Sequence, residues 1–137
     1  MKQNLGKLLI IFLAASLIMA GCSSSAMGAT SWPGLSSEDG MVYLASASGV
    51  YAVNTDSGTL QWSYPEKANA RIQCFAEPAV TPDCVIVGDF TRTIYALNKQ
   101  NGQEAWKFEG AKSRWIGSPL FSNDTLYAPN ADRNLYA

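Results

Sequence analysis

The sequence contains no histidine, and this absence excludes several kinds of enzyme chemistry. Ser-His-Asp and Cys-His catalysis need an imidazole as general base, and histidine-ligated zinc needs it as a ligand. An excess of positive charge is also lacking, because 10 basic residues stand against 11 acidic ones. The composition therefore predicts no nucleic-acid partner and no surface for anionic lipid.

A long hydrophobic run is absent everywhere except near the start of the chain. Lys2 and Lys7 precede the apolar run Leu8–Leu13 and its weaker continuation, which ends in the small residues Ala20 and Gly21. The run is shorter than the roughly 20 apolar residues that a membrane-spanning helix needs. Residues 1–21 are therefore predicted to be a secretory signal peptide.

The first of only three cysteines directly follows this segment. The tract Met19-Ala20-Gly21-Cys22 resembles the bacterial lipoprotein box, which implies that Cys22 is lipid-modified and becomes the new N-terminus. Serines follow it, so residues 22–31 are expected to form a flexible tether. The alternative is an ordinary signal peptide with a coincidental cysteine. The favoured interpretation is an extracytoplasmic, lipid-anchored protein of the cell envelope.

The two remaining cysteines, Cys74 and Cys84, could in principle form a disulfide in an oxidising compartment. A hairpin turning near Pro82 would place Cys84 opposite Val80, so that Cys74 lies roughly 20 Å further along the strand. We therefore expect two unbridged, largely buried thiols.

The main positive feature of the sequence is an internal repeat. The tract from Ala52 to Trp62 returns 44 residues later from Ala96 to Trp106, with alanine, asparagine, glycine and tryptophan at the same spacing. A period of about 40 to 45 residues built from short β-rich segments is typical of a β-propeller, in which each repeat forms one four-stranded blade. The predicted fold class is therefore all-β.

The repeat has a third copy, and one blade can be divided into strands. A tyrosine-alanine pair follows twelve residues after each of Asp39, Asp83 and Asp124. This spacing predicts strands in a fixed register. In the second copy we expect strands over 75–80, 84–87, 93–98 and 104–108, with Pro78 on the innermost strand.

The repeated tract resembles the pyrroloquinoline-quinone-type propeller repeat, whose docking motif reads Ala-x-Asp-x-x-Thr-Gly-x-x-x-Trp. Asparagine replaces aspartate at 54 and 98, and Ser57 and Asn101 stand where threonine is commonest. The resemblance covers residues 32–137. It implies a structural, blade-docking role for Ala52, Asn54, Gly58, Trp62, Ala96, Asn98, Gly102 and Trp106.

Physical reasons for this pattern can be read from the residue types. The glycines suit turns with positive φ, and the asparagines can hold such turns through hydrogen bonds to the backbone. Tryptophan supplies a large planar surface for stacking one blade on the next. Trp62 and Trp106 are therefore expected to be buried at equivalent positions.

The third copy stops after Tyr136-Ala137, so the sequence is expected to hold about two and a half blades. Propellers of the resembling family usually have about seven or eight blades. The expectation is an N-terminal part of a longer protein.

Three functions are compatible with these features. The favoured one is a noncatalytic scaffold that binds a protein or cell-envelope partner at its rim, because the repeat is similar to the propeller lipoproteins of outer-membrane barrel assembly. The alternative is a quinoprotein dehydrogenase using pyrroloquinoline quinone and calcium, with its site in further blades. Asp89, Asp132 and Glu77 are scattered carboxylates, better explained as turn or solvated residues than as calcium ligands. No catalytic residue, cofactor site or metal site is assigned within the sequence.

The third function is a sensor or substrate-docking part of a larger polypeptide. Trp32, Phe90 and Trp115 lie outside the docking motif and would be the aromatic residues for sugar or peptide docking. Packing roles are favoured for each of them.

A single substitution at Cys22 tests the lipoprotein interpretation. Replacing Cys22 with serine removes the acylated sulfur, so the Cys22→Ser protein should leave the membrane fraction. Fractionation with labelled fatty acid measures this. A variant that still incorporates the label and sediments with membranes would show that Cys22 is not the anchor.

Overall fold

The computed structural model describes residues 33–46, 49–67, 69 and 71–137. The predicted signal peptide, Cys22, the tether and Trp32 lie outside the described residues. Eleven β-strands and no helix occur in the described part of the chain, where no helix is long and apolar enough to cross a membrane. This confirms the all-β prediction.

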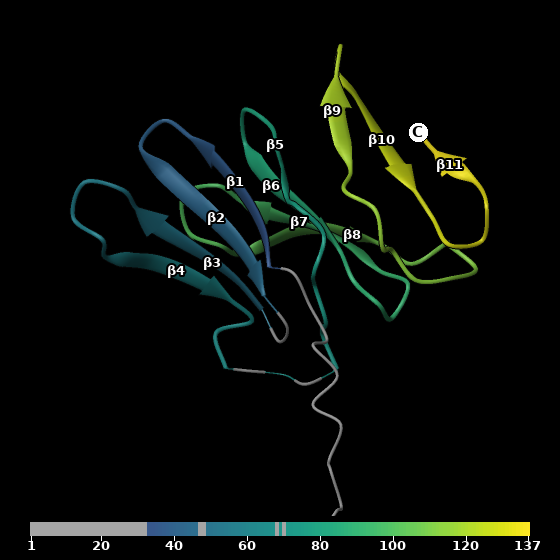
Figure 1. Ribbon diagram of the computed structural model, residues 1–137, viewed down its shortest axis with the longest axis horizontal. Helices are drawn as coiled ribbons and strands as arrows, with labels where there is room; N and C mark the ends of the chain where they lie inside the picture. The colour runs from purple at the N-terminus through teal and green to yellow at the C-terminus, as the bar shows by residue number, and fades with distance from the viewer. Residues whose placement is uncertain (1–32, 47–48, 68, 70) are drawn as a thin grey trace, which may run out of the picture.

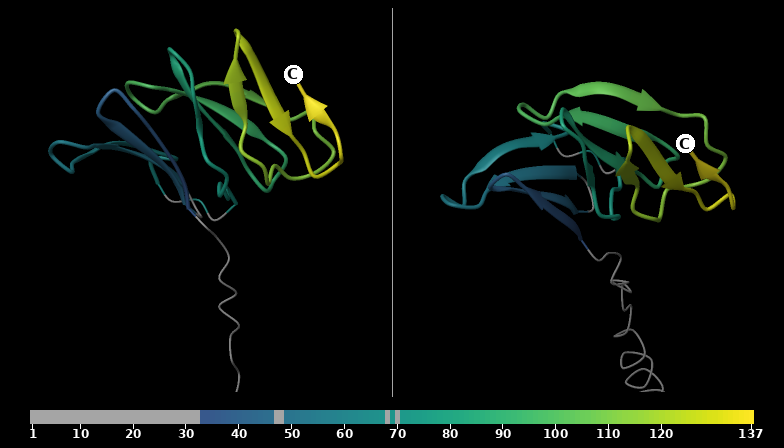
Figure 2. Two further views of the ribbon diagram at one scale, coloured as in Figure 1. Left: turned by 45° about the horizontal axis from the view of Figure 1, so that its top comes forward. Right: turned by 90° about the horizontal axis from the view of Figure 1, so that it is seen from above.

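The strands form three antiparallel sheets that follow one another along the chain, and each sheet is one blade (Figure 1). Blade 1 consists of β1 (Gly34–Glu38), β2 (Met41–Ser46), β3 (Gly49–Asn54) and β4 (Leu60–Tyr64). Blade 2 consists of β5 (Ala79–Val80), β6 (Cys84–Gly88), β7 (Ile94–Asn98) and β8 (Glu104–Phe108). Blade 3 consists of β9 (Leu120–Ser122), β10 (Thr125–Pro129) and β11 (Leu135–Tyr136). Further views show the blades arranged as a fan, as in a propeller (Figure 2).

The predicted strands of blade 2 agree with the structure except at the innermost one. Only Ala79–Val80 forms a strand, and the expected stretch 75–80 is otherwise irregular. Pro78 has no N–H group to donate to a ladder. Upstream of it, an isolated bridge between Cys74 and Asp89 replaces regular pairing.

The first repeat is shifted by one residue from the alignment of the three aspartates. In blade 1, Asp39 opens the turn between the two inner strands, because Glu38 pairs with Met41. In blades 2 and 3, Asp83 and Asp124 close the corresponding turns. The expected fixed spacing from aspartate to strand therefore fails in blade 1. Counted between equivalent paired residues, the β2–β3 connection of blade 1 is one residue shorter than the β6–β7 connection of blade 2. This difference cancels the shift, so Ala52 and Ala96 occupy equivalent positions.

The core lies between blades rather than within one blade. Along β6, Val85 and Val87 face blade 1, whereas Ile86 between them faces blade 3. Strands covered on both faces read as continuous apolar runs, which is the pattern of β6 and β7. Each blade therefore depends on its neighbour for burial of its apolar side chains.

Two of the aromatic residues outside the docking motif pack within the fold. Trp115 is only 1% exposed and contacts Tyr136 edge-on, with ring centroids 5.1 Å apart. Phe90 lies 4.8 Å from Phe75 between ring centroids, with the Arg114 guanidinium 5.4 Å from its ring. The packing interpretation therefore holds for Trp115, whose ring offers almost no surface for a ligand.

Both cysteines of the blades are free thiols, as predicted. Cys74 is buried in the core between blades 1 and 2, but Cys84 is only half-buried because it begins β6 beside the exposed turn. Cys84 stands opposite Thr81 rather than Val80, since the Thr81 N–H donates to the Cys84 carbonyl at 2.8 Å. The expectation of a largely buried thiol was therefore wrong for Cys84.

Burial of Cys74 makes stability depend on pH at alkaline values. Burial, and after it the charge of Asp89, raises the pKa of the Cys74 thiol from 9.0 to about 12. Between these values the unfolded chain has lost a proton that the folded chain keeps, so the free energy of unfolding should fall as pH rises from 9 to 12. Urea unfolding across this range measures the slope.

Cys74→Ala should have a shallower slope than the natural chain, whereas Cys84→Ala should retain most of it. An unchanged slope in Cys74→Ala would show that this thiol is not the responsible group.

Candidate functional site

The joint between blades 1 and 2 is built on the turn that precedes each outermost strand. In blade 1, Asn54 Oδ1 accepts hydrogen bonds from the N–H groups of Asp56 and Ser57, at 3.1 and 2.9 Å. In blade 2, Asn98 Oδ1 accepts from the N–H groups of Gln100 and Asn101, at 2.9 and 3.2 Å. An asparagine side chain that bonds to the backbone two and three residues ahead fixes the turn locally. The two repeats therefore build the same rigid turn.

A glycine completes each of these turns, for two different reasons. Gly58 and Gly102 both have positive φ, 66° and 71°, which favours glycine. Gly58 faces open space, whereas a Cβ on Gly102 would lie 2.5 Å from the Trp62 ring. Gly102 is therefore also the surface on which Trp62 rests.

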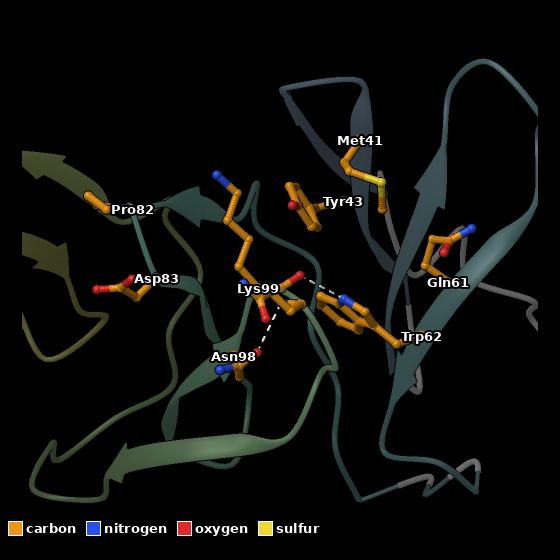
Figure 3. A pocket seen from close by; sticks show the side chains of 9 residues that line it. Met41, Tyr43, Gln61, Trp62, Pro82, Asp83, Asn98 and Lys99 are labelled. Atoms are coloured by element: carbon orange, nitrogen blue, oxygen red, sulfur yellow. Dashed lines mark hydrogen bonds between the residues drawn. The ribbon is translucent and has the colours of Figure 1, made fainter.

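Trp62 connects the two blades through its ring and its indole N–H. The indole Nε1–H donates to the carbonyl of Lys99 at 2.9 Å, from β4 to the β7–β8 turn (Figure 3). The residue is only 7% exposed and lies 5.9 Å from the Tyr43 ring between centroids. Its cross-strand neighbour Ala52 is fully buried. A second link joins the same blades, since Tyr64 Oη donates to Glu104 Oε2 at 2.8 Å.

The second repeat places its residues differently in one respect. Ala96 is buried and pairs with Trp106 across β7 and β8, as Ala52 pairs with Trp62. Trp106, however, is 44% exposed. The expectation that both tryptophans are equally buried was therefore wrong. In the described part of the chain, blade 3 has no turn after β11 that could cover Trp106 as the β7–β8 turn covers Trp62.

Beside this joint lies a groove between the turns of blades 1 and 2, which we call the rim groove. Its volume is about 460 Å³. The residues that line it are Met41, Tyr43, Gln61, Trp62, Pro82, Asp83, Asn98, Lys99 and Gln100 (Figure 3). They come from β2, β4, the end of β7 and the β5–β6 and β7–β8 turns, so the groove lies where the two blades meet.

One lysine carries positive charge into the rim groove. Lys99 Nζ pairs with Glu38, and its distance to Asp39 Oδ2 is 3.6 Å. The hydrogen bond to Glu38 raises the pKa of Lys99. Asp83 is exposed, and its carboxylate makes no hydrogen bond or ion pair with any residue that the structure describes. The groove and its edge therefore carry more negative than positive charge.

The inner wall of the rim groove has an unsatisfied polar group. Tyr43 is fully buried, and its hydroxyl has no hydrogen-bond partner among the described residues. Burial is the largest influence on this group and raises the pKa of Tyr43, so the hydroxyl stays protonated at neutral pH. A buried hydroxyl without a partner carries a free-energy penalty that a ligand or a solvent molecule would relieve.

The three carboxylates considered for calcium lie apart, and two of them hold loops. Buried Asp89 accepts hydrogen bonds from the N–H groups of Thr91 and Thr93, both at 2.8 Å. Asp132 accepts from the Tyr136 hydroxyl at 2.7 Å. Glu77 is exposed on the chain before β5. No group of three or more potential metal ligands occurs in residues 33–137 outside the gaps in the description.

Sequence reasoning missed the rim groove. Lys99 occupies a variable position of the repeat motif, and Glu38 lies 61 residues away in the sequence. Tyr43 looked like an ordinary strand residue. No local pattern joins these side chains, because strand pairing and blade stacking together place them in one site.

A family model described as outer membrane protein assembly factor BamB matches residues 20–137. Serine/threonine-protein kinase AfsK of Streptomyces griseus is 38% identical over 71 residues, which cover 50% of this chain and 9% of the kinase. Among solved structures, BamB from Moraxella catarrhalis has a TM-score of 0.62 at 19% identity, covering 74% of this chain and 30% of that one.

A quinohemoprotein alcohol dehydrogenase from Comamonas testosteroni has a TM-score of 0.59 at 25% identity, covering 72% of this chain and 17% of that one. The chain thus spans less than a third of the length of each of these three proteins. The similarity at 19% identity establishes the propeller fold alone.

The two glycines provide a matched test of the joint. Both require positive φ, so Gly58→Ala should lower the free energy of unfolding by about 1 kcal/mol through backbone strain. Gly102→Ala should lose about 1 to 3 kcal/mol more, because the new methyl group displaces the Trp62 ring. Urea unfolding of both variants measures the difference. Equal losses would contradict the role of Gly102 as the support for Trp62.

Proposed function

The chain belongs to the family of outer membrane protein assembly factor BamB, with PQQ-like propeller repeats, and on this basis we propose that it is a noncatalytic binding module of the cell envelope. In this proposal Cys22 carries a lipid anchor, and the blade turns present a rim to a protein partner. The lipid attaches the module to the membrane, and the rim binds the partner.

The proposal rests on one observation: the polar groups of the repeated motif form contacts within and between blades. The Trp62 indole N–H, the two asparagine carbonyls and the Gly102 surface are all engaged within or between blades. None of these groups remains available to activate a substrate. The repeat therefore supports construction of a rigid arc, and its free polar groups lie at the turns.

Rigidity favours a binding role because a preorganised surface loses little conformational entropy when a partner arrives. The turns at the rim are fixed by hydrogen bonds of their own: Thr55 N–H donates to the Gly40 carbonyl at 2.9 Å, and Lys99 N–H donates to the Asp83 carbonyl at 2.9 Å. These bonds link the inner and outer turns of each blade into one unit. A partner would therefore meet a preformed surface.

A second candidate is a quinoprotein dehydrogenase, favoured by the 25% identity to the Comamonas testosteroni alcohol dehydrogenase. That chemistry needs carboxylates that converge on calcium beside the quinone. The described carboxylates do not fit this requirement, because Asp89 and Asp132 are engaged in their own loops. We therefore derive no catalytic step from this structure.

Cofactor binding separates the two candidates. The full-length protein, mixed with pyrroloquinoline quinone and calcium, should neither bind the quinone tightly nor reduce a dye with alcohols or sugars. Equilibrium dialysis and a dye-linked assay measure these two properties. Stoichiometric quinone binding with turnover would contradict the noncatalytic proposal.

Binding at the rim has its own test in intact cells. A photo-crosslinking residue at Gln100, in the β7–β8 turn, should give a discrete adduct with an envelope protein. The same residue at Arg92, in the β6–β7 connection at the other end of the blade, serves as the control. Adducts at neither position, together with quinone turnover, would favour the dehydrogenase.

A further inference from the structure

The rim groove has an unbalanced set of polar groups, and this imbalance indicates what it can bind. Its hydrogen-bond donors are largely engaged: the Trp62 indole bonds to Lys99 O, and the Lys99 ammonium pairs with Glu38. Asp39 Oδ2 lies 3.6 Å from Lys99 Nζ, whose ammonium also pairs with Glu38. Among the described residues, the Asp83 carboxylate at the groove therefore has no donor to pair with.

The positions of these acceptors suit a broad, flat cation. Asp39 lies in the β1–β2 turn of blade 1 and Asp83 in the β5–β6 turn of blade 2, so negative charge comes from both sides of the joint. Met41 and Trp62 supply apolar lining to the groove (Figure 3). An ammonium is a compact point charge, whereas a guanidinium is planar and directs five N–H donors outward in a fixed fork.

A second, independent observation points to a ligand at the same place. The Tyr43 hydroxyl is buried against the groove without a partner, and in Figure 3 the side chain of Lys99 passes beside it. A hydroxyl can accept a hydrogen bond from a cationic donor. The Lys99 ammonium stays paired with Glu38 in this arrangement, on a four-carbon stem that has several rotamers.

We propose that the rim groove binds the guanidinium of an arginine side chain presented by a partner protein, with Asp83 and Asp39 pairing with it and Tyr43 at the inner wall. This inference rests on the proposed binding function and specifies the chemistry of the partner. The joint held by Trp62 connects the two blades whose turns carry these carboxylates. A lysine or a neutral side chain of equal length should bind less well.

The experiment uses the full chain labelled with ¹⁵N and three short peptides, which carry arginine, lysine or citrulline between glycines. The Trp62 indole N–H resonance reports on the groove, and the Trp106 indole N–H resonance is the internal control. The arginine peptide should shift the Trp62 resonance saturably. Citrulline has the same shape without the charge, so it should bind about tenfold more weakly or not at all.

Two substitutions test the carboxylates. Asp83→Asn should weaken arginine binding about tenfold by removing the unpaired charge. Asp124→Asn is the matched control, because Asp124 occupies the equivalent turn position of blade 3 and its φ of 57° suits asparagine. The control should leave the affinity unchanged.

Tyr43→Phe separates binding from folding. It removes a hydroxyl that has no partner in the described chain, so thermal stability should not fall. Affinity for the arginine peptide should fall nevertheless. A merely structural tyrosine would give the opposite result, with lower stability and unchanged affinity.

Several outcomes would overturn the inference. Equal shifts with arginine and citrulline, unchanged affinity in Asp83→Asn, or equal loss in Asp124→Asn would each show that the groove does not select a guanidinium. If Gln100 gives crosslinks in the natural protein while the arginine peptide fails to bind that same protein, the binding module stands and the groove assignment falls. Quinone turnover without crosslinks would instead remove the proposed function itself.

Discussion

The contact between Trp62 and the β7–β8 turn is the interaction on which the described arc depends. It combines ring packing on Gly102 with one hydrogen bond from the indole N–H to Lys99 O. A blade is a sheet with two apolar faces, so it needs a neighbour on each side to remove those faces from water. The tryptophan sets the distance and angle at which that neighbour sits. The core between blades 1 and 2 then follows, with side chains of both sheets interleaved.

The same contact creates the rim groove. Trp62 lines the groove itself, together with side chains from the turns of blade 2 and from β2 of blade 1. Lys99 serves both features, since its backbone carbonyl accepts the indole and its side chain pairs with Glu38 of blade 1. A residue in a structural turn thus also sets the charge of a surface groove. The proposed binding of arginine uses geometry that the fold needs for its own stability.

Relatives of this chain include proteins with different activities, and the fold does not separate them. The separation must come from side chains at particular places. In the described blades, the polar groups of the motif are engaged in turns and joints, while the Tyr43 hydroxyl, which has no partner among the described residues, lines the groove between blades 1 and 2. This distribution is the physical basis for placing recognition at the turns.

The sequence alone determined the class of fold, the repeat and the strand pairing of the motif, because these depend on local spacing. Ala52, Gly58 and Trp62 reappear as Ala96, Gly102 and Trp106, and both sets occupy the same strands and turns. The pattern could not show the one-residue shift at Asp39, since a shorter connection later in blade 1 compensates for it. Local spacing also could not distinguish buried Trp62 from exposed Trp106, because burial depends on the neighbouring blade. The rim groove was decided only by tertiary structure: Glu38, Tyr43 and Lys99 meet through the stacking of two sheets, and no spacing along the chain encodes a contact between them.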